Sequence, residues 1–167
     1  KKAEGQGPVE RELTWIDRHG KVLEVVGPRV TSTSMRLSPD GDRVAVREPP
    51  GLWVADLARN VKAPVMPTGA LSPTWSADGT RLLFGSQTGV EAVLAERDAL
   101  GATPMKTLYR LEGASAARLV PFDETGDGRL VVFGRTTGPR RRGIGVLSKA
   151  DGKVTPYLEN GFTGSQS

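Results

Sequence analysis

The fold is decided by the stretch MRLSPDGDRVAV at residues 35–46. Apolar and small residues flank a central Asp40-Gly41 pair. An aspartate in this position hydrogen-bonds backbone N–H groups two residues on, and the following glycine adopts the positive φ that many tight turns need. Pro39 fixes φ at the start of the turn. The stretch therefore predicts a strand, a tight turn and a returning strand.

The same pattern occurs twice more, in PTWSADGTRLLF at residues 73–84 and in LVPFDETGDGRLVVF at residues 119–133. The aspartates of the three Asp-Gly pairs lie 38 and then 49 residues apart. A repeat of about 40 residues built from strands and turns is typical of β-propeller blades, whose apolar faces are buried by stacking. We therefore predict an all-β partial β-propeller. The residues expected to set its turns are Asp40, Gly41, Asp78, Gly79, Asp127 and Gly128.

The order of strands and turns divides the chain into parts. Residues 1–11 are polar and contain glycines and a proline, so we expect a flexible leader. The propeller part covers residues 12–167. It comprises a hairpin at 12–27, four-stranded blades at 32–66, 71–110 and 114–158, and a C-terminal stub at 159–167. Longer loops are expected at 96–102 and 135–142. Such a chain, opening within one blade and closing on the approach to another, is expected to be a piece of a longer propeller.

The third repeat departs from the first two. We align its Phe122 with Trp75 and Leu37, and we expect all three side chains to pack between blades. On this alignment Asp123-Glu124 replaces the two residues that precede Asp-Gly elsewhere, and residues 125–126 are an insertion.

The composition narrows the function classes. The 23 Lys and Arg residues exceed the 19 Asp and Glu residues by four, and much of this excess lies at residues 1–2 and 140–142. Basic residues without an aromatic stacking platform are a weak footprint for nucleic acid, so we expect no nucleic-acid partner. Trp15, Trp53 and Trp75 lie in expected strands, which favours packing over carbohydrate stacking. The sequence contains no cysteine for a disulfide or a thiolate.

The sequence predicts no catalytic residue, no cofactor site and no metal site. His19 is the only histidine and lies in an expected turn, and no Gly-x-Ser-x-Gly motif or phosphate-binding glycine loop occurs. The run Asp123–Gly128 spaces oxygen ligands as calcium loops do, but Gly134 stands at the twelfth position, where such loops need an acidic residue. A lengthened turn is the preferred interpretation of this run.

Residues Arg140, Arg141 and Arg142 are the candidate partner-binding residues. One interpretation is a solvated loop tip between two strands. The other is a docking patch for an acidic protein, for peptidoglycan or for lipid phosphate, because arginine makes bidentate contacts with carboxylate and phosphate groups.

Residues 36–46 and 74–84 resemble the repeats of TolB-like, WD-repeat-like β-propellers, and LWVADL at 52–57 resembles the third strand of such blades. The opening LTWIDRHGKVL at 13–23 resembles the start of the propeller region that follows the kinase domain in some bacterial membrane serine/threonine kinases.

This resemblance implies a non-catalytic, extracytoplasmic sensor or scaffold region of a receptor-like kinase, with a membrane-anchored parent and a protein or cell-envelope partner. Two alternatives stay open: the gating propeller of a prolyl-oligopeptidase-like serine peptidase, and a free TolB-like periplasmic adaptor. An open arc of blades exposes apolar faces at both ends, so we also expect the isolated chain to self-associate.

Overall fold

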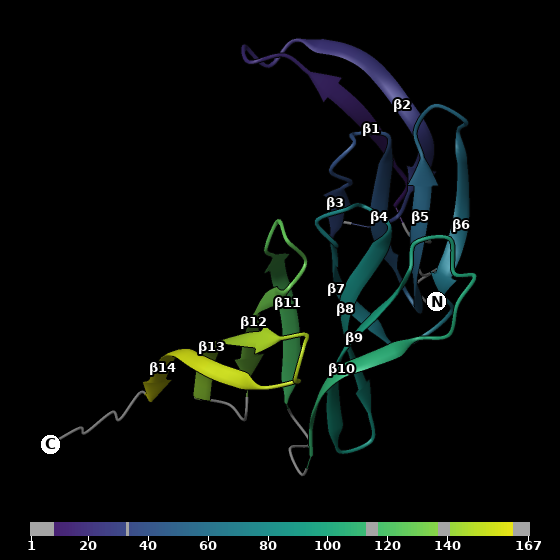
Figure 1. Cartoon of the computed structure of the whole chain (residues 1–167). Helices are drawn as coiled ribbons and strands as arrows, with labels where there is room; N and C mark the ends of the chain where they lie inside the picture. Colours follow the sequence, from purple (N-terminus) through teal and green to yellow (C-terminus); the bar gives the residue numbers. More distant parts are fainter. Residues whose placement is uncertain (1–8, 33, 113–116, 137–140, 162–167) are drawn as a thin grey trace, which may run out of the picture.

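A computed structural model describes residues 9–32, 34–112, 117–136 and 141–161 of the chain. Every regular element in these ranges is a β-strand, and the strands form one hairpin and three four-stranded sheets. The described residues include no helix long and apolar enough to cross a membrane. In Figure 1 the hairpin and the last sheet lie at opposite ends of the arrangement. The prediction of an all-β partial propeller is confirmed.

Each sheet is an antiparallel meander whose strands follow one another in chain order. The hairpin comprises β1 (Arg11–Ile16) and β2 (Val22–Val30). The first sheet comprises β3 (Met35–Leu37), β4 (Arg43–Glu48), β5 (Gly51–Asp56) and β6 (Val61–Met66). The second comprises β7 (Ala70–Trp75), β8 (Arg81–Thr88), β9 (Glu91–Asp98) and β10 (Lys106–Leu111). The third comprises β11 (Arg118–Glu124), β12 (Leu130–Thr136), β13 (Arg141–Ser148) and β14 (Val154–Gly161).

The hydrophobic core lies between the sheets rather than within one of them. One cluster joins the first and second sheets, another joins the second and third, and a smaller one joins the hairpin to the first sheet. The second sheet is therefore covered on both faces. Its strand β8 buries three consecutive side chains completely, Leu82, Leu83 and Phe84, as expected of a strand with no solvent face.

A glycine in β8 lets the second and third sheets approach closely. The carbonyl oxygen of Leu119, in β11, occupies the space that a Cβ atom on Gly85 would need. Any larger residue at this position would therefore force the two strands apart. The phenyl ring of Phe122 lies in the same way against Gly134 on the outer face of the third sheet.

Several strands are longer than the sequence indicated. β2 runs to Val30, and β9 pairs with β8 as far as Asp98, so the loop expected from residue 96 begins three residues later. β12 reaches Thr136 and β13 begins at Arg141, which shortens the expected loop 135–142 from both ends. In each case backbone pairing with the neighbouring strand continues the ladder past the polar residues that suggested a loop.

The ends of the chain extend past the described ranges. β14 continues through residues 159–161, where the stub was expected to begin, and residues 162–167 lie outside the described part. Most of the expected leader, residues 1–8, lies outside it as well, as do residues 114–116 at the start of the third blade.

The three residues expected to pack between blades have different environments. Trp75 is buried, with 5% of its surface exposed, whereas Leu37 and Phe122 are 45% and 47% exposed. The expectation is therefore wrong for Leu37 and Phe122. Of the other tryptophans, Trp53 is partly buried against the hairpin cluster, but Trp15 is 39% exposed because the hairpin covers only part of the first sheet.

Candidate functional site

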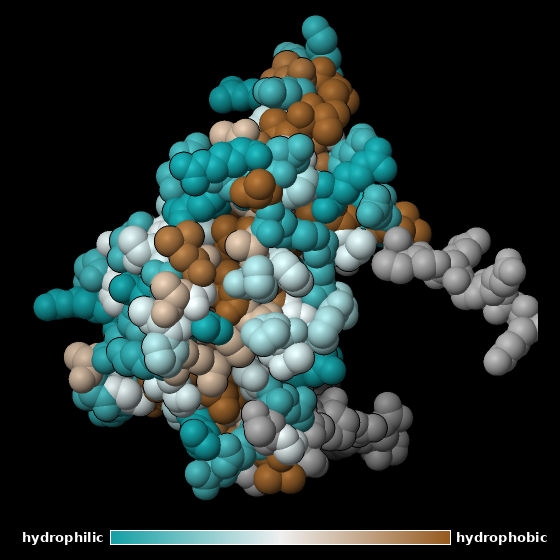
Figure 2. All heavy atoms as spheres, turned by 90° about the vertical axis from the view of Figure 1, so that its right-hand side faces the viewer, coloured by the Kyte–Doolittle hydropathy of each residue, from teal (hydrophilic) through white to brown (hydrophobic). Residues whose placement is uncertain are grey.

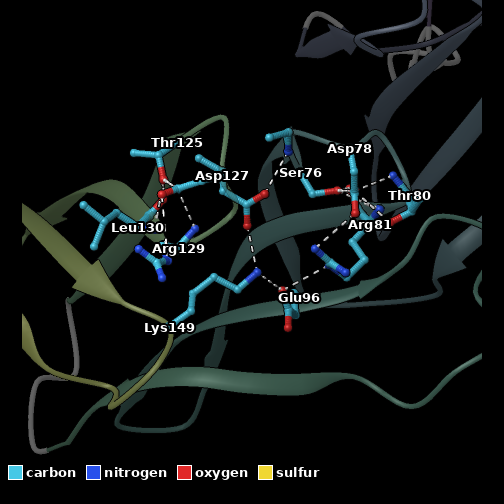
Figure 3. A network of polar contacts seen from close by, with 12 residues as sticks. Ser76, Asp78, Thr80, Arg81, Glu96, Thr125, Asp127, Arg129, Leu130 and Lys149 are labelled. Carbon is cyan, nitrogen blue, oxygen red and sulfur yellow. Dashed lines mark hydrogen bonds and ion pairs between the residues drawn. The ribbon is translucent and has the colours of Figure 1, made fainter.

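The three Asp-Gly turns share one hydrogen-bond pattern that includes a hydroxyl group two residues before the aspartate. In the second turn the Ser76 hydroxyl donates to Asp78 Oδ1 at 2.6 Å and accepts from the N–H of Arg81 at 2.9 Å. The N–H of Gly79 closes the turn on the carbonyl of Ser76 at 2.9 Å. Figure 3 shows this turn beside the corresponding turn of the third sheet.

In the other two turns, Ser38 and Thr125 take the place of Ser76. The Thr125 hydroxyl donates to Asp127 Oδ1 at 2.6 Å, and the N–H of Thr125 pairs with the carbonyl of Leu130 at 2.9 Å. The Ser38 hydroxyl makes the same contact with Asp40. Asp40 accepts hydrogen bonds from the Ser38 hydroxyl, the N–H of Asp42 and the Arg43 guanidinium. These bonds lower the pKa of Asp40 to about 2, with the Ser38 hydroxyl as the largest cause. The pKa values of Asp78 and Asp127 are lowered for the same reason.

This common geometry corrects the alignment of the third repeat. Because Thr125 corresponds to Ser76, residues 125–126 are not an insertion, and the residue that corresponds to Trp75 is Glu124 rather than Phe122. The sequence pattern favours Phe122 at this position because the other two strands end in an apolar residue, Leu37 or Trp75. The available signal was the hydroxyl residue that stands two positions before each of the three aspartates.

Glu124 belongs to an ion-pair network that joins the second and third sheets. Figure 3 labels two other members of this network, Glu96 and Lys149. The Lys149 ammonium, in the turn between β13 and β14, donates to Glu124 Oε1 and to Glu96 Oε2, both at 2.7 Å. Glu96 lies in β9, so this lysine bridges two sheets. The other oxygen of Glu124 accepts the N–H of Ala77, in the second-sheet turn, at 2.8 Å. Carboxylate, ammonium and backbone amide therefore satisfy one another across the interface.

The network is largely buried. The side chains of Glu124, Glu96 and Lys149 are 1%, 8% and 12% exposed. Two further cations approach Glu96, namely Lys106 at 3.3 Å and Arg81 at 3.4 Å. These two side chains are 67% and 37% exposed, and their charges offset the second buried carboxylate. The Arg81 Nε atom that faces Glu96 is itself buried and makes no hydrogen bond.

The electrostatics keep Lys149 and Glu96 ionised. Burial alone would lower the pKa of Lys149, but hydrogen bonds to Glu124 and Glu96 outweigh burial and raise it. Burial alone would raise the pKa of Glu96, but the hydrogen bond and charge of Lys149, followed by those of Lys106, outweigh burial and lower it. A lysine held protonated is not a nucleophile, and a glutamate held ionised is not a general acid. The network is therefore a structural contact that holds the second and third sheets together.

The interface between the first and second sheets is built differently. The indole N–H of Trp75 donates to the carbonyl of Arg36 at 2.9 Å. The guanidinium of Arg43 lies 5.0 Å from the centre of the Trp75 ring and donates to the carbonyl of Gly79 at 2.9 Å. Here an aromatic ring and an arginine bridge the sheets, with apolar side chains around them.

The outer face of the third sheet carries a hollow of about 290 Å³. Its apolar lining includes Val120, Phe122, Ile144 and Leu158, and arginines line it as well. Arg142 is one of these and is exposed, which brings part of the predicted arginine patch to this face. Arg141 and Arg142 belong to strand β13 and not to a loop tip, because β13 pairs with β14 from residue 141 onward. Arg140 lies outside the described residues.

The other candidate residues have simple local contacts. His19 lies in the β1–β2 turn, where its backbone N–H donates to Asp17 Oδ1 at 2.8 Å. In the run considered for calcium, Asp127 is engaged by the Thr125 hydroxyl and the N–H of Arg129. Among the described residues, no three His, Cys, Asp or Glu side chains gather as a metal site requires.

Comparison with known proteins identifies the fold. No family model and no curated protein matches the chain. Among solved structures, a TolB protein from Agrobacterium tumefaciens superposes with a TM-score of 0.63 at 16% identity, covering 89% of this chain and 60% of that one. Prolyl oligopeptidase B from Galerina marginata gives 0.55 at 16% identity, covering 78% and 22%. The periplasmic gluconolactonase PpgL of Pseudomonas aeruginosa gives 0.51 at 14% identity, covering 94% and 52%.

The chain therefore spans less than two thirds of the length of each of these proteins. At these identities the likeness shows the fold, which is that of a TolB-like β-propeller in partial form.

Proposed function

We propose that this chain is the binding and scaffold part of a β-propeller in the extracytoplasmic region of a bacterial receptor-like serine/threonine kinase, and that it carries no catalytic residues of its own. The resemblance of residues 13–23 to the propeller region that follows such kinase domains supports the parent. The likeness to TolB and to a periplasmic gluconolactonase supports a location outside the cytoplasm.

The observation that carries the proposal is the buried ion-pair network of Glu96, Lys149 and Glu124. Two buried carboxylates share one largely buried ammonium group, and this contact holds two sheets together. Groups used in this way position a rigid frame and leave recognition to the loops and outer faces. A propeller with this construction presents a surface, and the phosphoryl-transfer chemistry of a kinase parent lies in another domain.

The experiment that tests the parent combines the coding frame with protease accessibility. We expect a kinase domain and a membrane-spanning segment upstream of this segment in the reading frame. We also expect an antibody against residues 9–161 to detect a membrane protein whose epitope is digested when protease is added outside intact spheroplasts. An epitope that is protected in intact spheroplasts and digested only after lysis would contradict the proposal.

Two other parents are favoured by specific structural likenesses. The superposition on prolyl oligopeptidase B favours a gating propeller, and a serine hydrolase domain downstream in the frame would identify it. The superposition on TolB favours a free periplasmic adaptor, and a signal peptide with no enzyme domain in the frame would identify that.

We further propose that the arginine patch binds an acidic protein or an anionic cell-envelope component. Arg142 lines the hollow on the third sheet, where its guanidinium can reach a carboxylate or phosphate next to apolar side chains. Replacing Arg140, Arg141 and Arg142 by alanine should weaken sedimentation of the chain with purified peptidoglycan or with anionic lipid vesicles, and should reduce the salt dependence of that binding. Unchanged sedimentation with both would exclude the patch.

A further inference from the structure

Apolar surface is exposed at both ends of the sheet stack, whereas the apolar faces inside the stack are covered by the neighbouring sheets. At one end a hollow of about 350 Å³ lies between the hairpin and the first sheet. Its apolar lining includes Leu13, Trp15, Met35, Leu37 and Val44. The hollow on the outer face of the third sheet is the counterpart at the other end. We call these the hairpin-end hollow and the third-sheet hollow.

Large hydrophobic side chains are exposed at both ends. At the third-sheet end, Phe122 and Leu158 are 47% and 48% exposed. On the hairpin, Ile16, Leu23 and Val25 are 60%, 62% and 55% exposed. Figure 2 shows such hydrophobic side chains gathered at the top of the molecule, where the hairpin lies. Contiguous exposed apolar surface of this kind marks an interaction site.

The two ends carry opposite charges around their apolar surfaces. The charged residues that line the third-sheet hollow are arginines, Arg135 and Arg142. The charged residues that line the hairpin-end hollow and the neighbouring hollow beside it are acidic, namely Glu12, Glu24 and Asp42. Glu12 is paired with Arg29 at 2.8 Å, so Glu24 and Asp42 supply the negative charge of this rim. Both Glu24 and Arg142 have exposed side chains. An apolar face with a basic rim and an apolar face with an acidic rim are complementary, and both belong to one molecule.

We propose that the third-sheet hollow of one copy docks on the hairpin end of a second copy. This inference rests on the proposed binding role and names the partner of that surface as the chain itself. Within the molecule each internal sheet already packs face to face on the next, so the contact continues an arrangement that the chain makes twice. Such a head-to-tail contact is heterologous, and it closes into a ring of two or more copies or extends as an open chain.

The first experiment measures the mass of the full 167-residue chain by light scattering after gel filtration. Between about 1 and 100 μM we expect the mass to rise from that of one copy to that of two or more, a range that corresponds to modest apolar interfaces. A mass of one copy over the whole range would overturn the proposal.

Charge reversal then tests which surfaces meet. Arg142→Glu and Glu24→Arg each place like charges in the contact, so each variant alone should associate about tenfold or more weakly than the parent chain. In an equimolar mixture the reversed charges face each other at one junction and the original charges at the next. The mixture should therefore recover association, which neither variant shows alone.

Arg129→Glu is the matched control, because Arg129 is an exposed arginine of the same sheet that lies in the β11–β12 turn and does not line the hollow. It should leave association unchanged. The docking mode would be overturned if Arg142→Glu and Glu24→Arg each associated as strongly as the parent chain. It would also be overturned if the mixture of the two variants associated no more strongly than either variant alone. The reading frame and the protease accessibility of the epitope do not depend on whether copies associate in this mode, so failure of the docking mode is distinguishable from failure of the proposed function.

Discussion

The two inter-sheet contacts of this molecule use the same position of the repeat in opposite ways. Between the first and second sheets this position is Trp75. Its ring packs among apolar side chains and makes a cation–π contact with the Arg43 guanidinium. Between the second and third sheets the position is Glu124, which accepts from Lys149 and from a backbone amide. The turn that follows is the same in both. The turn therefore fixes where the side chain points, whereas the residues across the interface determine whether that side chain is aromatic or charged.

The largest expected effect is at the aromatic interface. Trp75→Ala removes a buried ring and leaves a cavity, which typically lowers the free energy of unfolding by about 4 kcal/mol. Trp75→Phe keeps most of the packing and loses the hydrogen bond to Arg36, so it should lower the free energy by about 1 kcal/mol. Urea denaturation measures both. Equal losses in the two variants would show that the ring contributes little.

The next effect is at the ionic interface. Lys149→Met leaves Glu124 and Glu96 without their shared cation in a buried site, and breaking a buried ion pair in this way costs about 3 kcal/mol. Urea denaturation again provides the measurement. A loss below about 1 kcal/mol would mean that this interface depends on the apolar contacts around Leu119 and not on the network.

The dependence on pH separates the two interfaces. A lysine with a raised folded pKa contributes stability that is fully present below its unfolded pKa, about 10.4, and is lost as the pH rises through the folded value. Glu96, with a lowered pKa, contributes stability that is present above its unfolded value, about 4.3, and is lost as the pH falls through the folded value. Melting temperatures from pH 3 to 11 should therefore decline at both ends, and Lys149→Met should flatten the alkaline decline.

In that profile the acid decline has a second source. The turn aspartates, including Asp40 with a pKa of about 2, are ionised in the folded chain at pH values where they would be protonated in the unfolded chain. Each turn aspartate has a lowered folded pKa. Its contribution to stability is therefore lost as the pH falls from about 4, the unfolded pKa, through the lower folded pKa. Asp78→Asn should diminish this part of the decline, and an unchanged acid profile would speak against the turns as its source.

The smallest effect is at the solvent side of the network. Lys106 also pairs with Glu96, but its side chain is 67% exposed, so Lys106→Met should lower the free energy of unfolding by less than about 1 kcal/mol. Denaturation in parallel with Lys149→Met compares a buried and an exposed lysine on one carboxylate. A Lys106→Met loss equal to the Lys149→Met loss would show that burial does not decide the strength of these pairs.

The strand–turn–strand units could be predicted from sequence because their determinants are local. Asp40-Gly41 and its two counterparts specify a turn from a few adjacent residues, and the flanking apolar runs specify strands. The inter-sheet network could not be predicted in this way, because Glu96 and Lys149 are 53 residues apart and meet only when the sheets stack. Glu124 was misplaced because an aromatic residue two positions earlier suggested a different alignment.

The absence of a side chain at Gly85 bears on the curvature of the whole assembly. Leu119 of the next sheet lies where a Cβ atom would be, so the second and third sheets meet at a spacing that only glycine permits. In a ring of stacked sheets, the distance between neighbours contributes to the rotation from each sheet to the next, and that rotation determines how many sheets complete a circle. A single hydrogen atom at residue 85 therefore helps to set how tightly this arc can close.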